Sequence, residues 1–167
     1  YLRVIKLAGR IVKQYPDYLV LIGLNPTYPE TGYGYIKLNK ELAARGQDKI
    51  FTVDSFKEKT DFKTAKRYLR NWAYLWNPAY FVFQAATMID LFKDHLPGHY
   101  RILMKIKASP AVLRSEFLKL KPISIDYGIM EKTKKLLCVP ASFAWADIGH
   151  WRNVQEILSS GPDSNVV

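Results

Sequence analysis

The chain has 167 residues, of which 49% are hydrophobic and 24% are charged, and these values suit one globular domain with a sizeable core, not a disordered chain. Its single cysteine excludes an internal disulfide and favours a cytoplasmic location, and no apolar run approaches the roughly 18 residues of a membrane span. The net charge of +10 suits phosphate-bearing ligands, but no zinc-finger spacing, RNA-binding aromatic motif or long basic tail is present, so we expect neither nucleic acid nor membrane as a partner.

The first part of the chain alternates between the patterns of helices and strands. Apolar residues recur on one side of residues 1–15, which predicts an amphipathic helix. Residues 18–23 are continuously apolar, the pattern of a strand that is buried on both faces. We expect further strands at 33–38 and 50–56, then a helix at 62–70 with Asp61 as its N-cap.

The second part of the chain is mainly helical. Residues 76–84 are predicted to cross a proline bend into an apolar strand, and a buried, unreactive Cys138 is expected in a strand at 135–139. The remaining periodic segments predict helices at 85–95, 100–108, 111–120, 125–133 and 151–158. Neither a linker nor a repeat divides the chain, so we expect one α/β domain over residues 1–167 with a large helical insertion between two strands.

The most distinctive segment runs from Asn25 to Ile36, where two prolines and two glycines fall within nine residues directly after an apolar strand. Proline fixes φ and donates no amide, while glycine lets a ligand approach the backbone closely. We therefore expect a rigid loop in which backbone amides around Gly32 and Gly34 lie free beside the carboxylate of Glu30, an arrangement that suits a polyhydroxylated ligand. Composition alone would indicate only a tight turn between two strands.

The amino-acid sequence of this loop, Pro-Thr-Tyr-Pro-Glu-Thr-Gly-Tyr-Gly-Tyr-Ile, resembles the signature of bacterial mannose-1-phosphate guanylyltransferases, which are sugar-nucleotide pyrophosphorylases. Four later segments resemble blocks of the same family in the same order, at residues 56–60, 76–83, 122–132 and 144–151. Five blocks in one order are not a chance match. The chain departs from the family pattern where Thr60 replaces a proline, Pro78-Ala79 replaces Ser-Gly, and His150 replaces a serine.

The resemblance implies that three residues bind the sugar phosphate. Glu58 would accept hydrogen bonds from sugar hydroxyls, and Lys59 would neutralise the phosphate as a catalytic residue. Asn77 would face the hexose, although an asparagine at this kind of position also forms turns. The neighbouring Pro78-Ala79 departure removes an amide close to the expected sugar and therefore bears on sugar preference.

Two acidic residues complete the implied site. Asp126 would reach the active-site cleft, although Asp126 or Ser124 would also serve as a helix cap, and capping is the simpler role for Ser124. Asp147 would be catalytic as a ligand of Mg²⁺, because this hard cation takes oxygen ligands. A lone aspartate on a loop would otherwise be read as a cap or turn residue.

The resemblance also implies the reaction, in which mannose 1-phosphate and GTP give GDP-mannose and pyrophosphate with Mg²⁺ bridging phosphate oxygens. The implied fold is a Rossmann-like, GT-A-like mixed sheet flanked by helices. The family's Gly-rich phosphate loop and Pro-x-Asp-His block are not in the sequence, so we expect a partial catalytic domain that lacks its N-terminal nucleotide-binding part and is inactive alone. A pyrophosphorylase for another sugar 1-phosphate, a non-catalytic basic module for phosphorylated ligands or nucleic acid, and a homo-oligomer remain open.

Overall fold

The computed structural model describes residues 1–45 and 48–148 of the chain. Within these residues the helices are α1 (Leu2–Gln14), α2 (Phe62–Leu69), α3 (Ala85–His95), α4 (Pro97–Ala108) and α5 (Leu113–Phe117), with a 3₁₀ turn at Pro110–Val112 and a π-helical turn at Asp126–Met130. The helix expected at 151–158 lies outside the described residues. None of the described helices is both long and apolar enough to cross a membrane.

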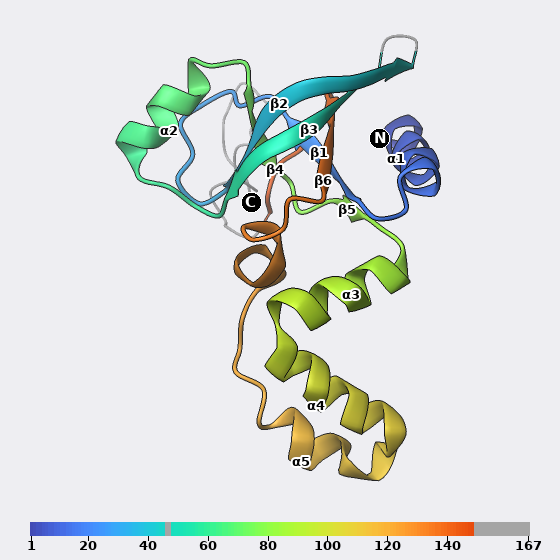
Figure 1. Ribbon diagram of the computed structural model, residues 1–167. Helices are drawn as coiled ribbons and strands as arrows, with labels where there is room; N and C mark the ends of the chain where they lie inside the picture. Colours follow the sequence, from blue (N-terminus) through green and yellow to red (C-terminus); the bar gives the residue numbers. More distant parts are fainter. Residues whose placement is uncertain (46–47, 149–167) are drawn as a thin grey trace, which may run out of the picture.

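The strands form one mixed sheet that closes on itself (Figure 1). They are β1 (Leu19–Leu24), β2 (Gly34–Arg45), β3 (Asp48–Lys57), β4 (Tyr74–Asn77), β5 (Phe81–Val82) and β6 (Leu136–Ala141), in the order β4-β2-β3-β6-β1-β5. β1 and β6 run parallel, whereas the other pairs are antiparallel. An additional pairing of Leu24 with Trp76 joins β1 to β4 and closes the sheet into a small barrel. The predicted α/β class is confirmed, but this closure was not anticipated.

β1 is the centre of packing, and all six of its residues are buried, as its apolar sequence predicts. Successive side chains of a strand point to opposite faces. Val20 and Ile22 therefore join an apolar cluster with Ile11 of α1, which lies beside the sheet in Figure 1. Leu19 and Leu21 join a second cluster with residues of β2, β3, β4 and α3. The sheet thus has a core on each side of β1.

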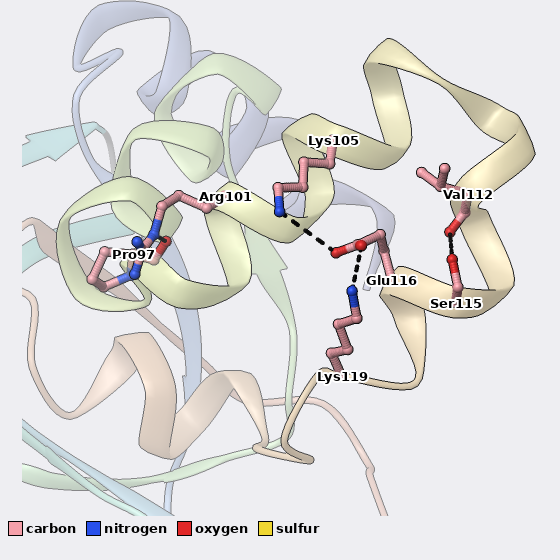
Figure 2. Close-up of polar contacts among 7 residues, drawn as sticks. All are labelled: Pro97, Arg101, Lys105, Val112, Ser115, Glu116 and Lys119. Atoms are coloured by element: carbon pink, nitrogen blue, oxygen red, sulfur yellow. Dashed lines mark hydrogen bonds and ion pairs between the residues drawn. The ribbon is translucent and has the colours of Figure 1, made fainter.

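The segment between β5 and β6 forms a helical arm of α3, α4 and α5, which extends away from the sheet (Figure 1). Met88 and Leu91 of α3 are buried, whereas α4 and α5 bury no side chain. At the far end, the carboxylate of Glu116 pairs with the ammonium groups of Lys105 and Lys119 (Figure 2). The hydrogen bond from Lys119 is the main cause that lowers the pKa of Glu116. The predicted helical insertion is confirmed.

The local signals in the sequence located some elements well. α3 has the bounds that periodicity predicts, and Asp61 caps α2 by accepting a hydrogen bond of 2.9 Å from the backbone amide of Thr64. As predicted, the chain bends at Pro78 and Ala79, where Ala79 has a φ of 59°, and continues into the short strand β5; the residues before the bend belong to a separate strand, β4. That left-handed backbone cannot continue a strand.

Other boundaries were predicted less well. β2 and β3 extend beyond the expected 33–38 and 50–56 into a long hairpin. α4 begins at Pro97 and not at residue 100, since proline suits the first turn of a helix. The helix expected at 111–120 divides into the 3₁₀ turn and α5, and the helix expected at 125–133 is a shorter π-helical turn.

The close packing of β1 on its neighbours generates a stability prediction at Gly23. A Cβ atom added there would lie 2.5 Å from Cδ1 of Leu75 and 2.9 Å from Sγ of Cys138. Because overpacking forces neighbours to shift, we expect Gly23→Ala to lower the free energy of unfolding by about 1–3 kcal/mol in urea titrations. Cys138 itself is fully buried, and burial raises the pKa of its thiol, as the prediction of an unreactive thiol requires.

The matched control for this prediction is Gly9→Ala in α1, where an added Cβ meets nothing within 4 Å. This change should leave stability unchanged or raise it by up to about 1 kcal/mol, because alanine favours a helix interior. A Gly23→Ala variant as stable as its parent would contradict the packing described for β1.

Candidate functional site

A cavity of about 230 Å³ opens where β2 begins and where β3 and β4 end. Six of the eight predicted site residues line it, namely Gly32, Gly34, Glu58, Asn77, Asp126 and Asp147. These residues come from all five sequence blocks that carry the family resemblance. The structure therefore gathers into one place residues that are spread over more than a hundred positions of the sequence.

Strand register explains how three of these residues meet. β2 lies between β3 and β4, with Tyr35 paired to Lys57 and Gly34 paired to Asn77. The start of β2, the end of β3 and the end of β4 therefore coincide, and Glu58, which directly follows β3, lies beside Gly34. The antiparallel pairing brings these three strand ends to the same end of the sheet.

Gly34 allows the closest approach in the cavity. A Cβ atom at this position would lie 2.7 Å from Oε2 of Glu58 and 3.3 Å from Cβ of Asn77. Only glycine permits such an approach without a shift of the neighbours. The carboxylate of Glu58 therefore lies against bare backbone.

Two partly buried carboxyl groups give the cavity its electrostatic character. Burial is the main cause that raises the pKa of Glu58, followed by the nearby Asp126. Burial also raises the pKa of Asp126, with Glu131 adding to the effect. Carboxylates held in this way accept hydrogen bonds from hydroxyl groups of a ligand, and acids with perturbed pKa values in a cavity are typical of functional sites.

Asn77 forms the turn that the sequence left open for it, and it also lines the cavity. Its Oδ1 accepts a hydrogen bond of 3.1 Å from the amide of Ala79, which is the expected asparagine turn. Its Nδ2 donates to Oδ1 of Asp126 over 3.5 Å, and the residue lines the cavity although only 8% of it is exposed. The turn therefore holds the amide group in place beside the carboxyl group.

Glu30 and Lys59 do not line the cavity. Oε1 of Glu30 accepts hydrogen bonds of 2.8 Å from the amides of both Thr31 and Gly32. These amides are consequently not free for a ligand, contrary to the expectation from the sequence, because the carboxylate folds back on its own loop. Lys59 is exposed next to Glu58 and has a φ of 59°. Roles for Glu30 and Lys59 in substrate binding stay predictions.

Aromatic residues that sequence reasoning missed form one wall of the cavity. Tyr33 and Trp145 line it, and their ring centroids lie 5.2 Å apart in an edge-to-face arrangement. Trp76 packs edge-on against Tyr33, with centroids 5.3 Å apart, and its Nε1 donates to the hydroxyl of Tyr35. The alternation Gly-Tyr-Gly-Tyr was the available signal, because in extended backbone it places the rings of Tyr33 and Tyr35 on the same face, and both belong to one apolar cluster.

Asp147 is brought to the cavity by the loop that follows β6. Burial, a hydrogen bond with Tyr28 and the charge of Asp147 raise the pKa of Tyr33, while a hydrogen bond with the backbone of Asp147 lowers it. Within residues 1–45 and 48–148 there is no group of three or more His, Cys, Asp or Glu side chains that could hold a metal ion. A role for Asp147 as a ligand of Mg²⁺ stays a prediction.

A second cavity of about 340 Å³ is larger but contains none of the predicted site residues. Its lining includes the apolar side chains of Leu38, Phe51 and Leu75. We take the smaller cavity as the candidate site because several polar groups with perturbed pKa values converge there, which a specific ligand requires.

The chain is similar to known nucleotidyl transferases over most of its length. The sequence pattern of the nucleotidyl transferase family matches residues 6–161. The mannose-1-phosphate guanylyltransferase of Salmonella muenchen is 34% identical over 156 residues, and that of Sinorhizobium fredii is 36% identical over 159 residues. Each of these matches covers 89% of this chain. The crystal structure of "mannose-1-phosphate geranyltransferase" from Thermus thermophilus matches 96% of this chain with a TM-score of 0.81 and 36% identity.

The matches cover only part of each relative. The chain spans 32% of the Salmonella protein, 30% of the Sinorhizobium protein and 45% of the Thermus chain. It therefore corresponds to about a third of the length of the curated relatives that it matches.

The raised pKa of Asp126 generates a prediction about stability and pH. Burial gives Asp126 a higher pKa in the folded state than in the unfolded state, where it is about 3.9. Its contribution to the free energy of unfolding is therefore fully present below the unfolded pKa and is lost as the pH rises through the folded pKa. At pH 7 the ionised Asp126 therefore opposes folding. We expect Asp126→Asn to raise the free energy of unfolding at pH 7 and to leave it unchanged near pH 3, as urea titrations at the two pH values will measure.

Asp54→Asn is the matched control, because Lys37 lowers the pKa of the exposed Asp54 carboxyl. Neutralising that carboxylate should shift stability at pH 7 slightly in the opposite direction. A loss of stability at pH 7 in Asp126→Asn would mean that the carboxylate is stabilised by its surroundings, contrary to the burial described here.

Proposed function

The chain belongs to the nucleotidyl transferase family, and from this premise we propose that it carries the sugar-phosphate side of a mannose-1-phosphate guanylyltransferase. In the proposed reaction a phosphate oxygen of mannose 1-phosphate bonds to the α-phosphorus of GTP, and the bond from that phosphorus to pyrophosphate breaks. The observation that carries the proposal is the cavity, which combines residues from each of the five blocks of the resemblance. The names of the two bacterial relatives agree with it.

Each polar group of the cavity has a task in this proposal. The carboxylates of Glu58 and Asp126 accept hydrogen bonds from mannose hydroxyls, and the amide of Asn77 orients the same ring. Gly34 leaves room for the sugar against the backbone. Lys59, exposed beside Glu58, supplies the positive charge for the sugar phosphate. The protein thus contributes mainly position and charge, as is usual for phosphoryl transfer.

Asp147 is the proposed Mg²⁺ ligand. The ion would supply positive charge to the phosphate oxygens, and Asp147 would hold it at the side of the cavity that the loop after β6 forms. A Rossmann-like, GT-A-like architecture for the complete catalytic domain is part of the same proposal. We also propose that these 167 residues alone do not turn over substrate, because their sequence contains no Gly-rich phosphate loop.

One specific feature favours a second candidate, a pyrophosphorylase for a different sugar 1-phosphate. Pro78 and Ala79 line the cavity next to Asn77, and Ala79 has a left-handed backbone with a φ of 59°. Proline has no amide to offer a sugar hydroxyl, so this wall of the cavity selects the sugar by shape. The two candidates differ only in the hexose that fits.

Calorimetry with sugar 1-phosphates tests the proposal directly. The chain should bind mannose 1-phosphate more tightly than free mannose and more tightly than glucose 1-phosphate. Tighter binding of glucose 1-phosphate would favour the second candidate, and binding of neither phosphate would contradict both. Pyrophosphate release from GTP and mannose 1-phosphate then tests turnover, which we expect to be undetectable for these residues alone.

Lys59→Ala should weaken the binding of mannose 1-phosphate by about 1.5–3 kcal/mol, the usual value of a hydrogen bond to a charged group. The affinity for free mannose should change much less, because mannose carries no phosphate. Lys105→Ala, on the exposed arm, is the control and should bind as the parent does. Equal affinity of Lys59→Ala and the parent for mannose 1-phosphate would remove Lys59 from the site.

Asp147→Asn should raise the Mg²⁺ concentration needed for half-maximal turnover in an active catalytic domain that contains this chain. The reason is that Mg²⁺ usually depends on one or two carboxylates in addition to substrate phosphates. Asp54→Asn, which removes an exposed carboxylate elsewhere, should leave the Mg²⁺ dependence unchanged. An unaltered dependence in Asp147→Asn would show that another residue holds the ion.

A further inference from the structure

The turn at Glu58 and Lys59 has hydrogen-bond partners in the segment that follows the helical arm. Oε1 of Glu131 accepts a hydrogen bond of 2.9 Å from the backbone amide of Glu58. The hydroxyl of Tyr127 donates to the backbone carbonyl of Glu58 over 3.5 Å. Both polar groups of one backbone position therefore have partners in the segment 126–131, which is about seventy positions away in the sequence.

This turn needs external support because of its backbone. Lys59 has a φ of 59°, in the left-handed region that residues other than glycine seldom adopt. Such a conformation persists only where the surrounding structure imposes it, and it is common at ligand sites. The two partners of Glu58 hold the backbone directly before Lys59.

The supporting segment is itself firmly anchored. Ile129 and Met130 are almost completely buried, with exposed fractions of 0% and 1%. The amide of Glu131 donates to the carbonyl of Asp126 over 2.9 Å. A Cβ atom on Gly128 would lie 2.9 Å from Cδ1 of Leu96, so the segment packs tightly against the junction of α3 and α4. Its backbone is therefore a rigid base for the turn.

The ion pair of Glu131 with Lys57 does not by itself explain the position of Glu131. Its carboxylate lies 3.6 Å from Nζ of Lys57, but that lysine is largely exposed and such pairs contribute little. Glu131 also adds to the causes that raise the pKa values of Glu58 and Asp126, so its charge opposes theirs. The hydrogen bond to the Glu58 amide is the interaction that offsets this repulsion.

We propose that Glu131 is a positioning residue for sugar-phosphate binding, acting through its hydrogen bond to the Glu58 amide and assisted by Tyr127. It holds the turn so that the Glu58 carboxylate lies in the cavity and the Lys59 ammonium group is presented beside it. Glu131 itself does not line the cavity. This inference rests on the proposed function for the ligand, but the geometry of the turn is testable without any ligand.

The decisive comparison is between Glu131→Ala, which removes the acceptor, and Glu131→Gln, which keeps an acceptor oxygen and removes the charge. Two measurements apply to each variant, namely hydrogen exchange of the Glu58 amide by NMR and the dissociation constant for mannose 1-phosphate. In Glu131→Ala we expect exchange of this amide to be about tenfold faster and the affinity to be about tenfold weaker, as the loss of one hydrogen bond predicts. Glu131→Gln and the control Lys57→Ala, which removes only the ion pair, should both resemble the parent.

Parent-like exchange and affinity in Glu131→Ala would overturn the inference, and so would equal losses in the Gln and Ala variants, because charge would then be responsible. If Glu131→Ala does not fold, Tyr127→Phe decides, since Tyr127 is 44% exposed and its ring is retained. That variant should weaken the affinity for mannose 1-phosphate, and an unchanged affinity would overturn the inference. If the parent binds no sugar phosphate, the proposed function fails, and exchange of the Glu58 amide alone then decides the role of Glu131.

Discussion

The antiparallel pairing of β2 with both β3 and β4 is the constraint on which the candidate site depends. It sets Gly34 opposite Asn77 and places the end of β3 beside the start of β2. A register shift of one residue in either pair would turn these side chains to the opposite face of the sheet. The absence of a side chain at Gly34 then lets the Glu58 carboxylate and Asn77 approach bare backbone. Sheet register and one glycine together define the floor of the cavity.

The site concentrates negative charge in a chain whose net charge is +10. Glu58 and Asp126 are partly buried near each other, and Glu131 lies close enough to raise the pKa of both. An arrangement of this kind opposes folding, and proteins commonly accept such a cost where groups are poised for a ligand. Sugar hydroxyls would satisfy the carboxylates, and a basic residue such as Lys59 would balance the charge of a sugar phosphate.

The sheet gives this site a rigid support. β1 is buried along its whole length and pairs with β6 on one edge and with β5 and β4 on the other. The closure between Leu24 and Trp76 links β1 to the strand that carries Asn77. Trp76 also joins the aromatic residues at the cavity wall through its contact with Tyr33. Packing in the core and the shape of the site are therefore connected through one residue.

The sequence by itself determined the features that depend on neighbouring residues. The periodicity of residues 85–95, the apolar run of β1 and the cap at Asp61 are local patterns, and the structure has each of them as predicted. The motif residues that meet in the cavity were likewise identified from short segments, although sequence alone gave no distances among them. Local chemistry is sufficient for such predictions because propensity and capping act within a few residues.

Only the tertiary structure decided the features that depend on contacts between distant segments. The closure of the sheet and the support of Glu58 by Glu131 both join positions that periodicity treats separately. The hydrogen bonds from the loop amides of Thr31 and Gly32 to the Glu30 carboxylate were likewise not predicted from the sequence. In each case the outcome follows from strand register and packing, and these are set by the whole fold.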